Sequence, residues 1–249
     1  NDEIGVLSSS LDDMTNELQK RISSAENFST DLVHEIRNPL TSLKSASEIL
    51  SETEEPIQRK KLISILNHDV QRVERLITDY SQMLKDEVAL SKEKMKKIDL
   101  KLIAKSVVDD FNNIYKTKRG IVVELIDKNN LDAYLIYGIE NRIEQIIANL
   151  LDNSISFSDD NKEILVQISI NNEEKISLKV IDQGKGFKEK DTHKIFKRFY
   201  SDRPEKFGEH SGLGLNIVKN LVDLHGATIS ASNNSNQKGA NVEVIFPNI

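Results

Sequence analysis

Residues 28–41 read Phe-Ser-Thr-Asp-Leu-Val-His-Glu-Ile-Arg-Asn-Pro-Leu-Thr. This stretch places a histidine (His34), a carboxylate (Glu35) and an amide (Asn38) in a long amphipathic helical pattern, followed by Pro39. His34 and Asn38 are four residues apart, so a helix puts them on one face. Pro39 has no N–H to donate to the carbonyl of Glu35, so we expect the helix to kink beside the histidine.

Upstream of this stretch, apolar residues recur at alternating steps of three and four, the spacing of a narrow coiled-coil seam. The seam consists of Ile4, Leu7, Leu11, Met14, Leu18, Ala25, Phe28 and Leu32. Arg21 takes one position where an apolar residue is expected, so the register weakens there or shifts to Ile22. A narrow seam has nothing to bury against in its own helix. We therefore expect a partner helix, most economically in a parallel homodimer.

Downstream, the helical pattern continues to Leu50 and then stops at acidic residues followed by Pro56. Such a sequence indicates a loop and the first turn of a new helix. A second helical pattern runs from Ile57 to about Leu90. Two long helices with a short loop form an antiparallel hairpin, and two hairpins form a four-helix bundle. The lysine-rich segment 92–97 marks the boundary of this region.

Beyond the boundary, strand patterns alternate with helical ones, which predicts an α/β sandwich with a layer of helices on one sheet. The expected strands are 121–126, 134–137, 164–170, 176–181, 228–231 and 242–246. The expected helices are 100–112, 139–153 and 214–224.

Composition limits the function classes. The 249 residues suffice for two modest domains. A net charge of −6 argues against a nucleic-acid partner, and the absence of cysteine excludes disulfides and thiolate metal sites. No apolar run approaches the roughly 18 residues that span a bilayer. The chain begins with Asn1, so we expect a fragment of a longer protein, and an upstream membrane segment stays open.

Three amides line one edge of the expected helix 139–153. Gln145, Asn149 and Asn153 fall at intervals of four residues. Amide oxygens are suitable ligands for Mg²⁺, which takes few protein ligands and several phosphate or water oxygens. A solvated polar face would give the same pattern, and this helix considered by itself favours that alternative.

Two glycine-containing motifs follow. Asp182-x-Gly184-x-Gly186 comes directly after a strand. A carboxylate there can accept a hydrogen bond from an exocyclic amine such as that of adenine, and glycines let the backbone approach a flat ring. The motif is also common in ordinary turns, so it is weak evidence alone.

The second motif, Gly-Glu-His-Ser-Gly-Leu-Gly-Leu at 208–215, opens the last helix. A helix N-terminus after small residues offers N–H groups to phosphate oxygens. The motif is neither a P-loop nor a dinucleotide fingerprint. About twenty largely polar residues with a few aromatic anchors separate the two motifs, which is typical of a mobile lid.

A fourth motif, Phe196-x-x-Phe199-Tyr200, lies between the two glycine motifs. In this order, the amide helix, the Asp182 motif, the aromatic motif and the last glycine motif resemble the N, G1, F and G2 boxes of the catalytic domain of sensor histidine kinases. That domain belongs to the ATPase superfamily shared with gyrase B, Hsp90 and MutL. Residues 28–41 resemble the phosphoacceptor H box of the same family. The resemblance covers essentially the whole chain, and four ordered motifs at fitting separations are highly specific. The surroundings of the H box and residues 149–158 also resemble alphaproteobacterial ChvG-like sensors.

The resemblance implies roles for the three residues of the first stretch. His34 would be the phosphoacceptor, and Glu35 would accept a proton from its second ring nitrogen as general base. Asn38 would position water when phosphate is removed from a partner regulator. We expect His68, His193, His210 and His225 to be solvated and without a role.

The resemblance also implies ATP and Mg²⁺ as cofactors. Asn153 would be the chief Mg²⁺ ligand and Asn149 its phosphate-side companion, while Asp182 would read adenine. The other residues expected to bind the nucleotide are Gly184, Gly186, Arg198, Gly208, Ser211, Gly212, Leu213, Gly214 and Leu215. Of these, Arg198 would reach the γ-phosphate from the lid. Two departures from the family pattern are Ser156, where a basic residue is usual, and Lys197, where an acidic one is usual.

By resemblance, residues 1–22 are the end of a HAMP-like signalling coiled coil. Residues 23–92 form the dimerisation and histidine phosphotransfer hairpin, and residues 97–249 form the catalytic ATP-binding domain. The expected fold is thus a dimeric four-helix bundle followed by an α/β-sandwich ATPase domain.

The implied function is ATP-dependent autophosphorylation of His34 and transfer of the phosphoryl group to an aspartate of a response regulator, with dephosphorylation of that regulator as a second activity. The expected partners are a second copy of the chain and a receiver domain, not nucleic acid. The implied location is the cytoplasmic portion of a bacterial inner-membrane sensor. A degenerate non-catalytic scaffold and a conformational ATPase of the Hsp90 type are the alternatives.

Overall fold

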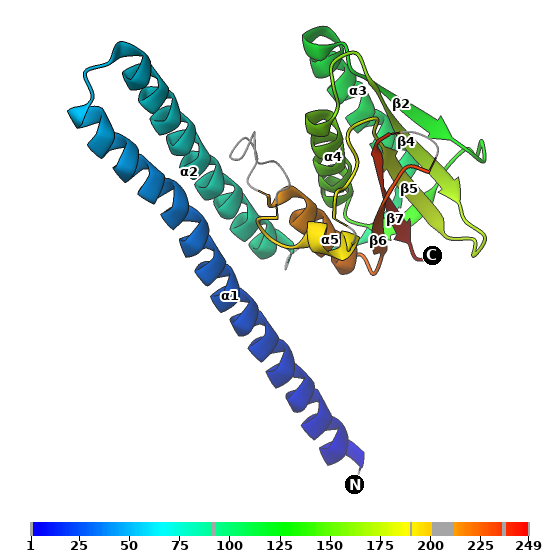
Figure 1. Ribbon diagram of the computed structural model, residues 1–249. Helices are drawn as coiled ribbons and strands as arrows, with labels where there is room; N and C mark the ends of the chain where they lie inside the picture. The colour runs from blue at the N-terminus through cyan, green and yellow to red at the C-terminus, as the bar shows by residue number, and fades with distance from the viewer. Residues whose placement is uncertain (1, 91–92, 190, 201–211, 236–237, 249) are drawn as a thin grey trace. The chain divides into compact units, whose positions relative to one another are not determined.

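The structure is a computed structural model that describes residues 2–90, 93–189, 191–200, 212–235 and 238–248. The chain divides into two compact units, one ending at Tyr80 and the other beginning at Ser81. The first contains a helical hairpin and the second an α/β domain (Figure 1).

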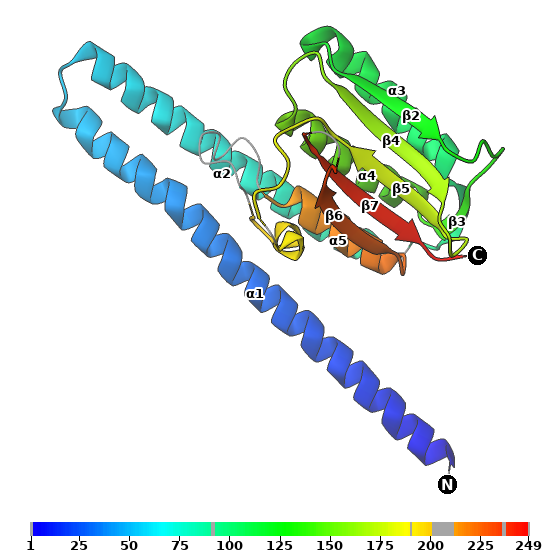
Figure 2. The same cartoon turned by 45° about the vertical axis from the view of Figure 1, so that its right-hand side comes forward.

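Two helices form the hairpin, α1 (Asp2–Glu52) and α2 (Pro56–Leu90), as predicted. Proline begins α2 because its fixed φ suits the first helical position, where no N–H is needed. Arg59 fixes the loop, since its Nη1 donates hydrogen bonds to the carbonyls of Leu50 (3.2 Å) and Thr53 (2.7 Å). Figure 2 shows the antiparallel course of the two helices.

Helix α1 continues through Pro39 without a break, and Pro39 is buried. The expected kink at this proline stays a prediction. Several large apolar side chains of the seam are exposed, among them Leu11, Met14 and Leu18. This exposure matches the expectation that the seam needs a partner helix. The side chains of Ile4, Leu7, Ala25 and Phe28 lie outside the described part of the chain.

The α/β domain contains three α-helices and seven strands within the described residues. The strands are β1 (Lys96–Asp99), β2 (Val122–Asp127), β3 (Leu135–Gly138), β4 (Glu163–Ile170), β5 (Ile176–Ile181), β6 (Thr228–Asn233) and β7 (Ala240–Phe246). The helices are α3 (Leu100–Arg119), α4 (Glu140–Phe157) and α5 (Gly214–Leu224), with a short 3-10 helix, η1 (Thr192–Phe196).

Five strands form the main sheet in the order β2-β4-β5-β7-β6, and only β2 and β4 are parallel neighbours in it. The remaining strands, β1 and β3, form a separate antiparallel pair. The expectation of one sheet is therefore wrong for the strand near 134–137. Strand β1 was not predicted, because Lys96-Lys-Ile-Asp is short and reads as a charged linker until β3 supplies its hydrogen-bonding partner.

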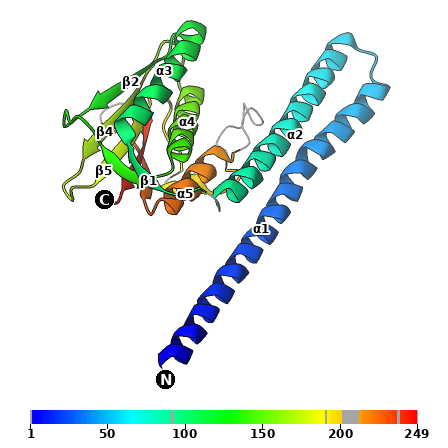
Figure 3. The ribbon, with the colours of Figure 1, turned by 180° about the vertical axis from the view of Figure 1, so that it is seen from behind.

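The helices cover one face of the main sheet, as Figures 1 and 3 show. Alternate residues of β4 (Ile164, Val166 and Ile168) face this layer and are fully buried. They pack in one core with the apolar stripe of α4, which includes Ile143, Ile146, Ile147 and Leu150. The core thus determines which face of α4 is buried. It thereby also places the amide side chains along the other edge of the helix.

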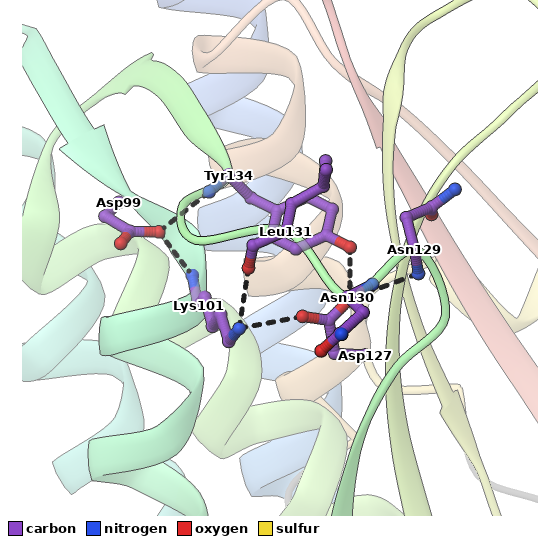
Figure 4. Close-up of polar contacts among 7 residues, drawn as sticks. All are labelled: Asp99, Lys101, Asp127, Asn129, Asn130, Leu131 and Tyr134. Carbon is purple, nitrogen blue, oxygen red and sulfur yellow. Dashed lines mark hydrogen bonds and ion pairs between the residues drawn. The ribbon is translucent and has the colours of Figure 1, made fainter.

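A polar network ties the start of α3 to the connection between β2 and β3 (Figure 4). Asp127 accepts hydrogen bonds from the Tyr134 hydroxyl, from Lys101 Nζ (2.8 Å) and from the backbone N–H of Asn130 (2.8 Å). Asp99 caps α3 and accepts from the N–H groups of Lys101 and Tyr134, both at 3.0 Å. The hydrogen bonds from Lys101 and Tyr134 are the main cause that lowers the pKa of Asp127 to about 2.

Candidate phosphoacceptor and nucleotide sites

The predicted phosphoacceptor is exposed to solvent on α1. His34 is exposed and makes no hydrogen bond or ion pair with any residue that the structure describes. Asn38, one turn further on, is also exposed. The ring nitrogens of His34 are therefore accessible to an incoming group, and the expected common face of His34 and Asn38 follows from the continuous helix.

The structure does not bring Glu35 to His34. Adjacent residues on a helix do not face each other, and the Glu35 carboxylate instead turns toward α2. Its Oε2 accepts a hydrogen bond from Arg72 Nη2 at 2.9 Å, and both side chains are largely shielded from solvent. The general-base role of Glu35 thus stays a prediction, and Arg72 is a partner that sequence reasoning missed.

The amide edge of α4 is not a fully solvated face. Asn149 and Asn153 are both partly buried. Asn149 Nδ2 is buried and has no hydrogen-bond partner within the described part of the chain. A buried amide donor without an acceptor raises the free energy of the folded state. An acceptor on a bound molecule would remove this penalty. A phosphate oxygen fits that requirement.

Gln145 differs from the two asparagines. Its Oε1 accepts a hydrogen bond from Arg142 Nη1 at 3.1 Å, so its amide is engaged within α4. The amide row predicted from spacing therefore contains one residue that supports the helix and two that remain available.

Asp182 directly follows β5 and is rigidly held. Its Oδ1 accepts hydrogen bonds from the N–H of Gly184 (2.8 Å) and of Ala240 (3.1 Å). The residue is 7% exposed, and burial raises the pKa of its carboxyl. The other oxygen accepts no hydrogen bond from the described residues, so it is available to an amine of a flat ligand.

Glycine is required beside Asp182 for two different reasons. A Cβ on Gly184 would lie 2.7 Å from the Phe157 carbonyl oxygen, which is too close. Gly186 has a φ of 75°, which favours glycine. The close approach of Gly184 to Phe157 also brings the Asp182 turn against the end of α4.

The turn between β6 and β7 contacts the backbone of Asp182. Asn234 Nδ2 donates a hydrogen bond to the Asp182 carbonyl at 2.9 Å. Gly239 approaches the same carbonyl so closely that a Cβ would lie 2.0 Å from its oxygen. The turn between β6 and β7 therefore supports Asp182.

The last glycine motif is described in part. Gly212 has a φ of 73°, and a Cβ there would lie within 2.9 Å of the Phe199 backbone. Leu213 is the N-cap of α5 and makes no side-chain capping bond, while Gly214 and Leu215 form the first turn. Arg198 is partly buried, but Gly208, His210 and Ser211 lie outside the described residues. The phosphate contacts predicted for this segment stay predictions.

Comparison with known families assigns both parts of the chain. Residues 24–89 match the His Kinase A (phospho-acceptor) domain, and residues 138–248 match the histidine kinase-, DNA gyrase B-, and HSP90-like ATPase family. The chain belongs to the sensor histidine kinases.

Curated sensor histidine kinases include close relatives of this chain. It is 38% identical to Sensor protein ChvG of Rhizobium meliloti over 96% of this chain, and 37% identical to Sensor protein ChvG of Agrobacterium fabrum over 93%. These alignments cover 42% and 40% of the two relatives, so the chain spans less than half of their length. The predicted resemblance to ChvG-like sensors is confirmed.

Among solved sensor histidine kinases, the fold is similar to that of ThkA in its complex with the response regulator protein TrrA. The TM-score is 0.64 at 24% identity, over 92% of this chain and 63% of that one. No helix in the described part of our chain is both long and apolar enough to cross a membrane.

For one histidine of this sensor histidine kinase, the predicted solvent exposure differs from that in the structure. His225 is 4% exposed, so the expectation of a solvated side chain is wrong. Its Nε2 accepts a hydrogen bond from the N–H of Ile139 at 3.1 Å, and its Nδ1 lies 2.7 Å from the Leu221 carbonyl oxygen. His225 thus joins the end of α5 to the start of α4. Its position seven residues after Val218, in register with the apolar stripe of α5, could have revealed this.

Arg119, at the end of α3, is another residue that the sequence did not reveal. Its guanidinium donates hydrogen bonds to the carbonyls of Ile155 (2.8 Å) and Ser158 (2.7 Å) and to Asp160 (2.6 Å). A cation at the C-terminal end of a helix also interacts favourably with its dipole. Arg119 therefore fixes the end of α4 that lies against the Asp182 turn.

Proposed function

We propose that this chain phosphorylates its own His34 from ATP and passes the phosphoryl group to an aspartate of a response regulator. The observation that carries the proposal is the pair of unused polar groups in the ATPase-like domain, Asn149 Nδ2 and the second oxygen of Asp182. One suits a phosphate oxygen and the other suits the adenine amine. The accessible His34 supplies the nucleophile.

In the proposed reaction, a ring nitrogen of neutral His34 forms a bond to the γ-phosphorus. The bond between that phosphorus and the bridging oxygen breaks, and its electron pair leaves with ADP. The proton on the second ring nitrogen passes to an acceptor. We propose that this acceptor is Glu35, once its carboxylate has released Arg72 and turned toward His34. Neutral imidazole is available for this step near neutral pH.

We further propose that Asn153 provides the amide oxygen that binds Mg²⁺, which would neutralise charge on the phosphates. Asn149 would donate to a phosphate oxygen, because its buried Nδ2 is the group that needs an acceptor. Asp182 would fix the orientation of the base, and the glycines of its turn would leave room for the ring. At position 156 the family pattern expects a basic residue, whereas the hydroxyl of Ser156 donates a hydrogen bond to the carbonyl of Asn153.

The exposed apolar residues of α1 support a homodimer that forms a four-helix bundle. The proposed partner is a receiver domain, with Asn38 placing water for its dephosphorylation. Because the chain spans less than half of its ChvG relatives, we propose that it is the cytoplasmic part of a longer membrane sensor, with residues 1–22 as the end of a HAMP-like relay.

Incubation with γ-labelled ATP and Mg²⁺ tests the reaction. We expect acid-labile label on the unaltered chain, none on His34→Gln, and normal labelling on the matched control His68→Gln. Addition of a receiver domain should then remove label from the kinase. Absence of label on the unaltered chain would favour a non-catalytic scaffold, whereas phosphate release that persists in His34→Gln would favour a conformational ATPase.

A further inference from the structure

Helix α2 carries a carboxylate in its buried stripe. Leu62, Asp69 and Leu76 are seven residues apart, so they lie along one side of the helix, and all three are buried. Asp69 is 7% exposed, although the residues before and after it in this stripe are leucines. A buried carboxylate loses its hydration, so it lowers the stability of the hairpin unless a partner compensates.

The two oxygens of Asp69 differ in their surroundings. Oδ1 lies 3.5 Å from Nδ1 of the adjacent His68. Oδ2 is buried and has no hydrogen-bond partner among the residues that the structure describes. A buried oxygen without a donor raises the free energy of the folded state. It is therefore suited to accept a hydrogen bond in a second state of the hairpin.

A donor for this oxygen lies one helical turn further along α2. Arg72 is three residues after Asp69, and side chains at this spacing are neighbours on a helix surface. Arg72 Nη2 donates to Glu35 Oε2 on α1 at 2.9 Å, and the Arg72 side chain is 13% exposed. A guanidinium that is shielded from water is stable only beside an anion. If Glu35 releases Arg72, a second carboxylate must receive it.

We propose that Asp69 is a positioning residue for the phosphorylation of His34. It accepts the Arg72 guanidinium when Glu35 turns away to take the proton of the histidine. This inference rests on the proposed function, in which the Glu35 carboxylate must release Arg72 before it reaches His34. The guanidinium keeps its charge and an anionic partner throughout, so the shift of Arg72 leaves no buried charge without compensation.

The shift of Arg72 affects the transfer step and not the binding of ATP. Without the Asp69 carboxylate, Arg72 stays on Glu35, and the proton acceptor remains engaged. A lost hydrogen bond between charged groups should lower the rate at saturating ATP by about tenfold. The affinity for ATP should not change, because Asp69 and the proposed nucleotide-binding residues belong to different compact units.

The variant Asp69→Asn removes the charge and keeps the shape of the side chain. We expect labelling at saturating ATP to be about tenfold slower, with an unchanged dissociation constant for a fluorescent ATP analogue. The matched control is Glu74→Gln, an exposed acidic residue on the same helix, which should change neither quantity. A labelling rate that is unchanged or raised in Asp69→Asn, or an altered affinity, would overturn the proposal.

Removal of Arg72 separates positioning from a structural role. In Arg72→Gln, Glu35 has no guanidinium to release, so the further change Asp69→Asn should leave the labelling rate of that variant as it is. If Asp69 served only the packing of the hairpin, its replacement would lower the rate by the same factor in both backgrounds. That result would reject the shift of Arg72.

Hydrogen exchange gives a readout that does not need kinase activity. Mass spectrometry of peptides from residues 60–76 reports the local stability of the hairpin in the full chain. Asp69→Leu should slow their exchange, because leucine completes the buried stripe and removes an oxygen that lacks a donor. In a Glu35→Gln background, Arg72 should already pair with Asp69. There the same change should speed exchange, because it removes the remaining carboxylate from the guanidinium.

The direction of these two effects decides the outcome. Slower exchange in both backgrounds, or in neither, would show that Asp69 does not receive Arg72. If the unaltered chain takes no label but the two effects have opposite signs, Asp69 receives Arg72 and the proposed kinase reaction fails.

Discussion

At the scale of single residues, the sites combine side chains that are tightly held with side chains that are left unused. Asp182 shows both, since two backbone N–H groups hold one oxygen while the other stays available. His34 and the Asn149 amide likewise lack partners among the described residues. The order of the motifs in the sequence, through their resemblance to those of histidine kinases, pointed to these residues. It could not predict the support from Asn234 and Gly239, because that support depends on a turn more than 50 residues away in the chain.

Asp127 provides a residue-scale prediction about stability and pH. Its hydrogen bonds hold its pKa at about 2, below the ordinary 3.8. The stabilising contribution should therefore be complete above pH 3.8 and disappear as the pH falls toward 2. Asp127→Asn should lower the melting temperature of the α/β domain at neutral pH. The difference from the unaltered chain should shrink in acid, as thermal unfolding followed by circular dichroism would show. A difference that stays constant down to pH 2 would contradict this account.

At the scale of elements, the hairpin was predicted almost to the residue, because proline and apolar periodicity are local signals. Helix α3 extends to Arg119, beyond the predicted end at 112, and stops at Gly120, whose φ of 64° suits a left-handed C-cap. The order of the strands was harder to predict from the sequence. The pairing of β1 with β3 and the parallel pairing of β2 with β4 are set by the packed core.

His225 connects two elements and gives a prediction at this scale. Burial lowers its pKa below the ordinary 6.5. The neutral ring therefore stabilises the domain fully above pH 6.5, and that stability is lost as the pH falls from 6.5 through the lowered pKa. His225→Leu should cost about 1–3 kcal/mol at pH 8, because the buried N–H of Ile139 loses its acceptor. Urea unfolding would measure the loss.

The control for that measurement is His193→Leu, since His193 is exposed. It should be nearly neutral at either pH. In His225→Leu the loss of stability between pH 8 and pH 5.5 should be smaller than in the unaltered chain. If both chains lose the same stability over this range, His225 does not titrate as its burial requires.

At the scale of the whole molecule, the proposed nucleophile and the proposed nucleotide site lie in two compact units that divide within α2, between Tyr80 and Ser81. The change from coiled-coil periodicity to alternating strands and helices predicted two domains, with a boundary at 92–97 that stays a prediction. The contacts of Glu93 with Asn141 and Arg142 could not be predicted, since a glutamate among lysines at 92–97 reads as part of a charged linker until α4 supplies its partners.

The central claim is that ATP held by Asp182 supplies the phosphoryl group that reaches His34. Its most direct test is the ATP dependence of His34 labelling in Asp182→Asn, with folding verified by circular dichroism. We predict that the ATP concentration for half-maximal labelling rises by about tenfold or more, because a hydrogen bond to a charged group contributes about 1.5–3 kcal/mol. Labelling of His34 at an unchanged ATP concentration would contradict the account.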